Sequence, residues 1–84
     1  MRKCVDFYIK DWTIYPGGRT KEVGDYSADE LAEILVKLME DEKAEFLYVY
    51  MDGVRGYALS FLDQLVADLL DAGILFKVNF LSEN

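Results

Sequence analysis

Histidine is absent from this sequence, and cysteine and proline each occur only once. Without histidine, the most common general base and metal ligand in proteins is missing, which excludes Ser-His-Asp and Cys-His catalytic arrangements. The single thiol, Cys4, cannot close a disulfide within the chain and cannot by itself supply a thiolate zinc site. We therefore expect no enzymatic activity, no metal and no cofactor, and a reducing, cytoplasmic environment.

Basic residues are also scarce, because 9 lysines and arginines stand against 16 aspartates and glutamates, for a formal net charge of −7. Such a surface repels nucleic-acid phosphates and anionic lipids, and it attracts a basic protein. No apolar run approaches the ~20 residues of a membrane span, and the first residues do not form a targeting signal. The sequence favours a protein partner, although the excess of acid has a simpler interpretation, which is solubility.

Apolar residues nevertheless make up 52% of the chain and aromatic residues 14%, a composition too hydrophobic for a disordered chain. We expect one domain over residues 1–84 with a thin core. Six tyrosines and five phenylalanines in so small a chain can leave an apolar patch, so a homodimer is an open alternative.

Hydrophobic periodicity alternates between strand and helix patterns. Ser27 and Glu30 form a predicted capping box, in which the Ser27 hydroxyl accepts a hydrogen bond from the backbone of residue 30. Residues 12–15 either continue the first strand through a bulge or pair with it after a turn. The expected elements are strands over 4–9 and 12–15, a helix over 28–42, a strand over 45–51, a helix over 59–72 and a strand over 74–80. This order, β(β)αβαβ, predicts an α/β fold with a small mixed sheet of about four strands and two helices.

A glycine-rich turn stands between the first strand and the first long helix. Gly17 and Gly18 allow a tight turn, and Arg19 follows them with a positive charge. A phosphate-binding loop needs more glycines, a lysine and a helix that starts at once. The pattern therefore indicates a turn in preference to a phosphate cradle.

The segment from Asp52 to Gln64 leaves the central strand and enters the second long helix, at the edge where open α/β sheets present ligands. Ser60 lies in the first helical turn, where the positive end of the helix dipole would tolerate a phosphate. A simpler interpretation is that Ser60 only caps or starts the helix. The expected buried stripe of this helix is Phe61, Leu62, Leu65, Val66, Leu69 and Leu70. The candidate partner-binding residues are Asp52, Arg55, Tyr57, Ser60, Asp63 and Gln64.

Several short motifs occur in one order along the chain. They are Pro16-Gly17-Gly18-Arg19, Gly24, Ser27-Ala28-Asp29-Glu30, Asp52-Gly53-Val54-Arg55-Gly56-Tyr57 and Ser60-Phe61-Leu62. Together they resemble the STAS-like family of domains of unknown function, small relatives of the STAS domain of anti-sigma-factor antagonists. The resemblance implies a mixed sheet flanked by helices, no enzymatic activity, and a kinase-like partner that phosphorylates a serine at the position of Ser60. The chain has Ala58-Leu59-Ser60 where antagonists usually have Asp-Ser-Ser or Asp-Ser-Thr.

Two functions follow. The first is a STAS-like regulatory domain of bacterial or phage origin that binds a kinase-like protein, with Ser60 as a phosphorylation switch. The second is a small acidic inhibitor of phage type that blocks the basic groove of a defence or nucleic-acid-binding protein. Tyr48 and Tyr50 are expected in the core under a helix and not as a stacking platform for nucleic acid. Clustering of six acids would favour the inhibitor: Glu33, Glu40, Asp41, Asp63, Asp68 and Asp71.

Overall fold

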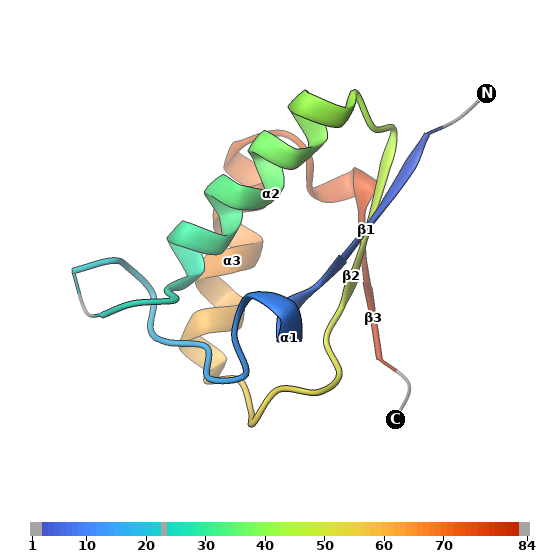
Figure 1. The fold of residues 1–84 in the computed structure, drawn as a ribbon. Coiled ribbons are helices and arrows are strands. Elements are labelled where there is room, and N and C mark those ends of the chain that lie inside the picture. The colour runs from blue at the N-terminus through green and yellow to red at the C-terminus, as the bar shows by residue number, and fades with distance from the viewer. Residues whose placement is uncertain (1–2, 23, 83–84) are drawn as a thin grey trace.

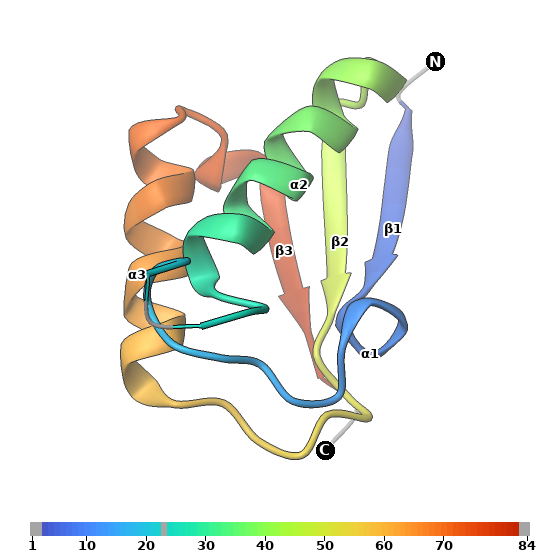
Figure 2. The same cartoon turned by 60° about the vertical axis from the view of Figure 1, so that its left-hand side comes forward.

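A computed structural model describes residues 3–22 and 24–82 as a two-layer α/β domain. The elements are β1 (Cys4–Tyr8), α1 (Ile9–Trp12), α2 (Ala28–Glu42), β2 (Phe46–Tyr50), α3 (Leu59–Asp71), the 3-10 helix η1 (Leu75–Lys77) and β3 (Val78–Leu81). The strands lie in the order β1-β2-β3, and both neighbouring pairs are parallel. Figures 1 and 2 show α2 and α3 on the same face of this sheet. Successive crossovers in one direction place their helices in this way.

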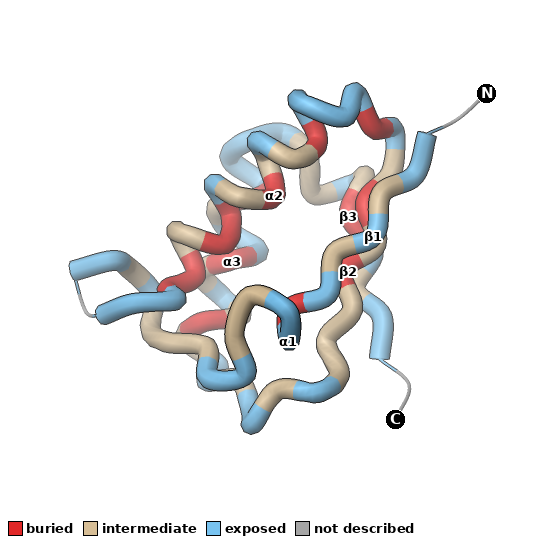
Figure 3. The backbone as a smooth tube through the Cα atoms, in the orientation of Figure 1, coloured by how far each residue is buried: buried red, intermediate tan, exposed pale blue. Residues whose placement is uncertain are grey.

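The core lies between the two long helices and the sheet (Figure 3). Leu31 and Leu35 of α2 and Leu65 and Leu69 of α3 are buried, each pair being four residues apart on one helical face. Gly73, with φ of +77°, ends α3 in the left-handed conformation that its sequence position predicts. The two long helices and the central strand are thus confirmed as expected.

The sheet differs from the expectation in two ways. It is parallel throughout and not mixed, and the described residues form three strands and not four. Residues 12–15 do not form a strand, because the chain leaves β1 through the single helical turn of α1, which buries Ile9. The Thr13 N–H donates to the Ile9 carbonyl oxygen (2.8 Å), so this segment turns away from the sheet instead of pairing with it.

The last strand is also shorter than its alternating pattern predicts. Residues 75–77 form η1, in which the Lys77 N–H donates to the Ile74 carbonyl oxygen (2.9 Å). β3 therefore begins at Val78, and Phe76 points into solvent. The left-handed exit from α3 at Gly73 leads directly into this turn, and a turn of this kind cannot pair with β2.

Candidate functional site

The loop at residues 52–58 crosses the carboxyl ends of the strands, as the sequence predicts. The Arg55 N–H donates to the Ile14 carbonyl oxygen (2.8 Å), which ties this loop to the chain that follows α1. The Arg55 guanidinium lies 5.9 Å from the centroid of the exposed Tyr15 ring. The Tyr57 hydroxyl donates to the Met51 carbonyl oxygen (2.8 Å). Tyr57 therefore shapes the loop, whereas Arg55 remains accessible to a partner.

Replacing Tyr57 with phenylalanine is expected to lower the free energy of unfolding by about 1 kcal/mol at pH 7, since the hydrogen bond to Met51 is lost. Burial, together with the Asp52 carboxylate, raises the pKa of Tyr57 to about 12. Because the folded-state pKa exceeds the unfolded value near 10, this phenol stabilises the fold below pH 10. That contribution is lost as the pH rises from 10 to 12.

Urea unfolding at pH 7 and pH 11 would measure both effects. The stability lost between these pH values should be smaller in Tyr57→Phe than in the parent protein. Tyr15→Phe is the matched control, because the Tyr15 ring is exposed. An equal alkaline loss in Tyr57→Phe and the parent would contradict the assignment.

The second half of the predicted partner surface lies on α3. Ser60 is half-buried in the first turn, and Asp63 is exposed. The Gln64 amide donates to the Asp68 carboxylate (2.8 Å), one turn further along the helix. Of these three candidate residues, therefore, Asp63 is exposed, whereas Ser60 and Gln64 are half-buried.

The Pro16-Gly17-Gly18-Arg19 turn closes the start of α2. The Ala28 N–H donates to the Gly18 carbonyl oxygen (2.9 Å), and the Asp29 N–H donates to the Arg19 carbonyl oxygen (3.1 Å). A phosphate cradle requires free backbone N–H groups directed at the ligand. Here the turn offers carbonyl oxygens to the helix, so its role is to satisfy donors that α2 would otherwise leave without a partner.

The predicted capping box at Ser27 is wrong. Ser27 makes no side-chain bond to the helix backbone; it is fully buried, and its hydroxyl donates to the Asp29 carboxylate. That hydrogen bond holds the pKa of Asp29 below its usual range, as does the donation from the Lys21 N–H. The carbonyl oxygens of Gly18 and Arg19 accept hydrogen bonds from the first backbone N–H groups of α2. The Ser27 hydroxyl is therefore available to donate to the Asp29 carboxylate.

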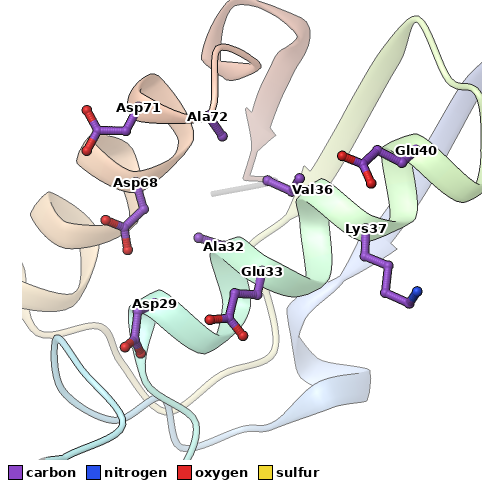
Figure 4. A pocket seen from close by; sticks show the side chains of 9 residues that line it. All are labelled: Asp29, Ala32, Glu33, Val36, Lys37, Glu40, Asp68, Asp71 and Ala72. Carbon is purple, nitrogen blue, oxygen red and sulfur yellow. The ribbon is translucent and has the colours of Figure 1, made fainter.

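A groove of about 600 Å³ runs between α2 and α3, on the side away from the sheet. Its floor is apolar, from Ala32 and Val36 of α2 and Ala72 after α3, and carboxylates stand on both walls (Figure 4). The acidic residues that line it are Asp29, Glu33, Glu40, Asp68 and Asp71. Lys37 is the one basic residue in the lining, and it pairs with Asp41 at 3.7 Å.

Parts of this acidic lining are already engaged within the chain. Glu33 pairs with Lys21 (2.8 Å), which raises the pKa of the Lys21 ammonium. Asp68 accepts from Gln64, as described above. Over residues 3–22 and 24–82, Glu40 and Asp71 make no ion pair or side-chain hydrogen bond. The groove therefore keeps uncompensated negative charge on both helices.

The sequence alone does not predict a groove between α2 and α3. Of the six acids whose clustering would favour the inhibitor, four line the groove, whereas Asp41 and Asp63 lie outside it. Asp29 was assigned only to the helix start, although its spacing with Glu33, Val36 and Glu40 places all four on one face of α2. None of the six candidate partner-binding residues lines the groove.

The lining of the groove has more acidic than basic side chains. The described residues hold no group of three or more metal-ligating side chains, and the five carboxylates lie at an open surface. Within the same part of the chain, every helix is too short or too polar to cross a lipid bilayer. Comparisons with protein-family models, with curated proteins and with solved structures each found no match to this chain.

Proposed function

We propose that this chain is a non-enzymatic protein-binding domain whose groove between α2 and α3 receives a basic segment of another protein. The observation that carries the proposal is the placement of five carboxylates on two helices around a shared apolar floor. Lysine and arginine side chains of a partner would meet the walls, and an apolar side chain such as leucine would meet Ala32 and Val36.

Charge and shape together indicate the kind of segment. With a net charge of −7, the whole protein steers a basic partner toward it, and the groove concentrates that field. A concave surface receives a convex element such as a helix or an extended peptide. An acidic inhibitor that enters a partner's basic groove would need a convex acidic surface, so the concave shape favours a domain that seats a basic segment.

Neutralising the groove is expected to weaken binding of a basic probe by roughly tenfold to thirtyfold, which corresponds to about 1.4–2 kcal/mol. The probe is a fluorescently labelled peptide of lysine, arginine and alanine with leucine at every fourth position, and binding is followed by anisotropy. The groove variant carries Glu33→Gln, Glu40→Gln, Asp68→Asn and Asp71→Asn. Its affinity for the probe should also depend less on salt than that of the parent.

A second fourfold variant controls for net charge. It carries Asp11→Asn, Glu22→Gln, Asp25→Asn and Glu45→Gln, which are exposed acids outside the groove. Its affinity should fall by less than about threefold, because only the long-range field is weakened. Equal losses in the two variants would mean that the probe responds to overall charge, and the groove would no longer be the binding site.

A phosphorylation switch at Ser60 is a second candidate, in line with the STAS-like resemblance. It is favoured by the position of Ser60 in the first turn of α3, directly after the loop at the strand ends. A phosphate there would interact favourably with the positive end of the helix. Incubation with ATP and a kinase-like protein encoded beside this one, followed by mass spectrometry, tests it. An unmodified Ser60 would remove the switch and leave the groove proposal standing.

A further inference from the structure

Within residues 3–22 and 24–82, no helix covers the second face of the sheet. Leu47 and Val49 of β2 point into the core, so the alternate residues of each strand point away from α2 and α3. Both long helices lie on the opposite side (Figures 1 and 2). The strand register sets these outward residues in three rows: Cys4–Phe46, Asp6–Tyr48–Asn79 and Tyr8–Tyr50–Leu81. We call these eight residues the open sheet face.

Its composition is that of a contact surface. Tyr48 and Tyr50, expected in the core under a helix, lie on this face instead and are half-buried by their neighbours. The Tyr8 and Tyr50 rings are stacked, with centroids 4.3 Å apart and planes at 9°. The Tyr50 hydroxyl donates to the Asp6 carboxylate (3.1 Å), which raises the pKa of Tyr50. The Tyr8 and Tyr50 side chains are therefore held in place before any partner arrives.

Parallel sheets are almost always covered on both faces, because their strands present apolar residues to both sides. Here the open sheet face carries four aromatic rings and Leu81. Among its eight residues, Asp6 is the only carboxylate, and none is lysine or arginine. In a chain of net charge −7, this is a surface on which two copies can meet with little like-charge repulsion.

We infer that the open sheet face is the interface of a homodimer, in which two sheets stack face to face around a two-fold axis that runs along the strands. Such an axis places β1 of one copy opposite β3 of the other. Each row of outward residues then lies opposite the same row of the second copy. Asp6 then faces Asn79 of the second copy, twice, as an acceptor facing an amide donor. A two-fold axis parallel to the sheets but perpendicular to the strands would instead place Asp6 of one copy opposite Asp6 of the other. The two carboxylates would then repel each other.

In the favoured arrangement Tyr48 packs against its own copy at the centre, and Tyr8 packs against Leu81 at the rim. Stacked sheets lie about 10 Å apart and cross at roughly −30°, which keeps the central row in contact. The exposed Leu59, Val66 and Leu70 of α3 form a competing apolar stripe. Asp63 interrupts that stripe, so pairing α3 with its own copy would juxtapose like charges.

The area of the face sets the strength of the dimer. Three strands of about five residues span roughly 14 by 16 Å, which is well short of the ~800 Å² per partner of a standard interface. We therefore expect a dissociation constant in roughly the 10⁻⁵–10⁻³ M range. Because each copy is strongly negative, added salt should strengthen the dimer, whereas it weakens the binding of a basic segment in the groove.

Sedimentation velocity from about 5 μM to about 1 mM tests the inference in the concentration range just given. The weight-average mass should rise toward twice the chain mass of 9.7 kDa. Tyr48→Lys should abolish this rise, with circular dichroism confirming that the variant is folded. Leu70→Lys, on the exposed stripe of α3, is the matched control and should dimerise as the parent does.

A second pair of variants tests the axis. Asn79→Asp should weaken the dimer by roughly threefold to tenfold, because it puts two carboxylates opposite each other twice. Adding Asp6→Asn to it should restore the parent affinity, since an amide again faces an acid. A protein that stays monomeric to about 1 mM, or that loses its dimer in Leu70→Lys and keeps it in Tyr48→Lys, would overturn the interface. A failure of the second substitution to restore affinity would overturn the axis.

Discussion

Phe61→Ala is expected to lower the free energy of unfolding by about 3–5 kcal/mol, one of the largest effects that a single substitution in this chain can have. The Phe61 side chain is fully buried (0% exposed) in the first turn of α3. Its ring centroid lies 6.1 Å from that of Tyr57, so it joins the helix to the loop above the strand ends. Its removal leaves a cavity, and the single layer of helices offers few neighbouring side chains that can move in to fill it.

Phe76→Ala is the matched control, because the same atoms are removed from a ring that is 78% exposed on η1. We expect its effect to stay within about 0.5 kcal/mol. Urea unfolding followed by circular dichroism measures both variants. A domain of 84 residues is stabilised by only about 4–13 kcal/mol, so Phe61→Ala should remove a large share of that stability and shift the urea midpoint strongly downward. Comparable losses in the two variants would contradict the burial that distinguishes them.

Periodicity predicts the helices well and their exposed edges poorly. The stripe expected on α3 includes Val66 and Leu70, yet both are exposed, while Phe61, Leu65 and Leu69 are buried. A helix at the margin of a two-layer domain is covered on one side only. The apolar stripe of α3 is therefore wider than the part of the helix surface that this fold buries. The local sequence pattern does not indicate how many layers of helices and sheets the fold has.

For the strands too, the local pattern predicts where the central strand lies, but not which of its faces is buried. β2 is the central strand of the sheet, as expected for residues 45–51. Tyr48 and Tyr50 are expected in the core under a helix, but they alternate with the buried Leu47 and Val49 and so point to the opposite face. Two crossovers in one direction put α2 and α3 on one face, which leaves the tyrosines on the other. Strand propensity at residues 12–15 likewise gave way to the helical turn that buries Ile9.

The acidic groove was within reach of the sequence because helical spacing fixes which acids share a face. What the spacing does not give is the pairing of α2 with α3, since that depends on how the crossovers pack. The loop in the candidate surface at residues 52–64 follows the carboxyl end of β2 and leads into α3. Some of its polar side chains stabilise the loop itself, as the Tyr57 hydroxyl does by donating to the Met51 carbonyl oxygen.

Gly17→Ala is expected to destabilise the domain by about 3 kcal/mol, although position 17 lies in a loop. A Cβ atom there would stand 2.4 Å from the Asp25 carbonyl oxygen, which is backbone and cannot rotate away. Relief of that contact requires the two loop segments to separate. The Gly17 N–H, which donates to the Tyr26 carbonyl oxygen (2.8 Å), would lose its partner. Overpacking alone costs about 1–3 kcal/mol, and the broken hydrogen bond adds about 1 kcal/mol.

The consequence of Gly17→Ala should extend to the start of α2. The carbonyl oxygens of Gly18 and Arg19 accept from the Ala28 and Asp29 N–H groups, so a displaced turn releases both donors. Amide hydrogen exchange should show loss of protection at residues 28 and 29 in addition to the global destabilisation seen in urea. Arg19→Ala is the control: it removes an exposed side chain and keeps the backbone, so its effect should stay within about 0.5 kcal/mol. Should Arg19→Ala destabilise as much as Gly17→Ala, the turn would act through its side-chain charge, and the backbone role assigned to it would be wrong.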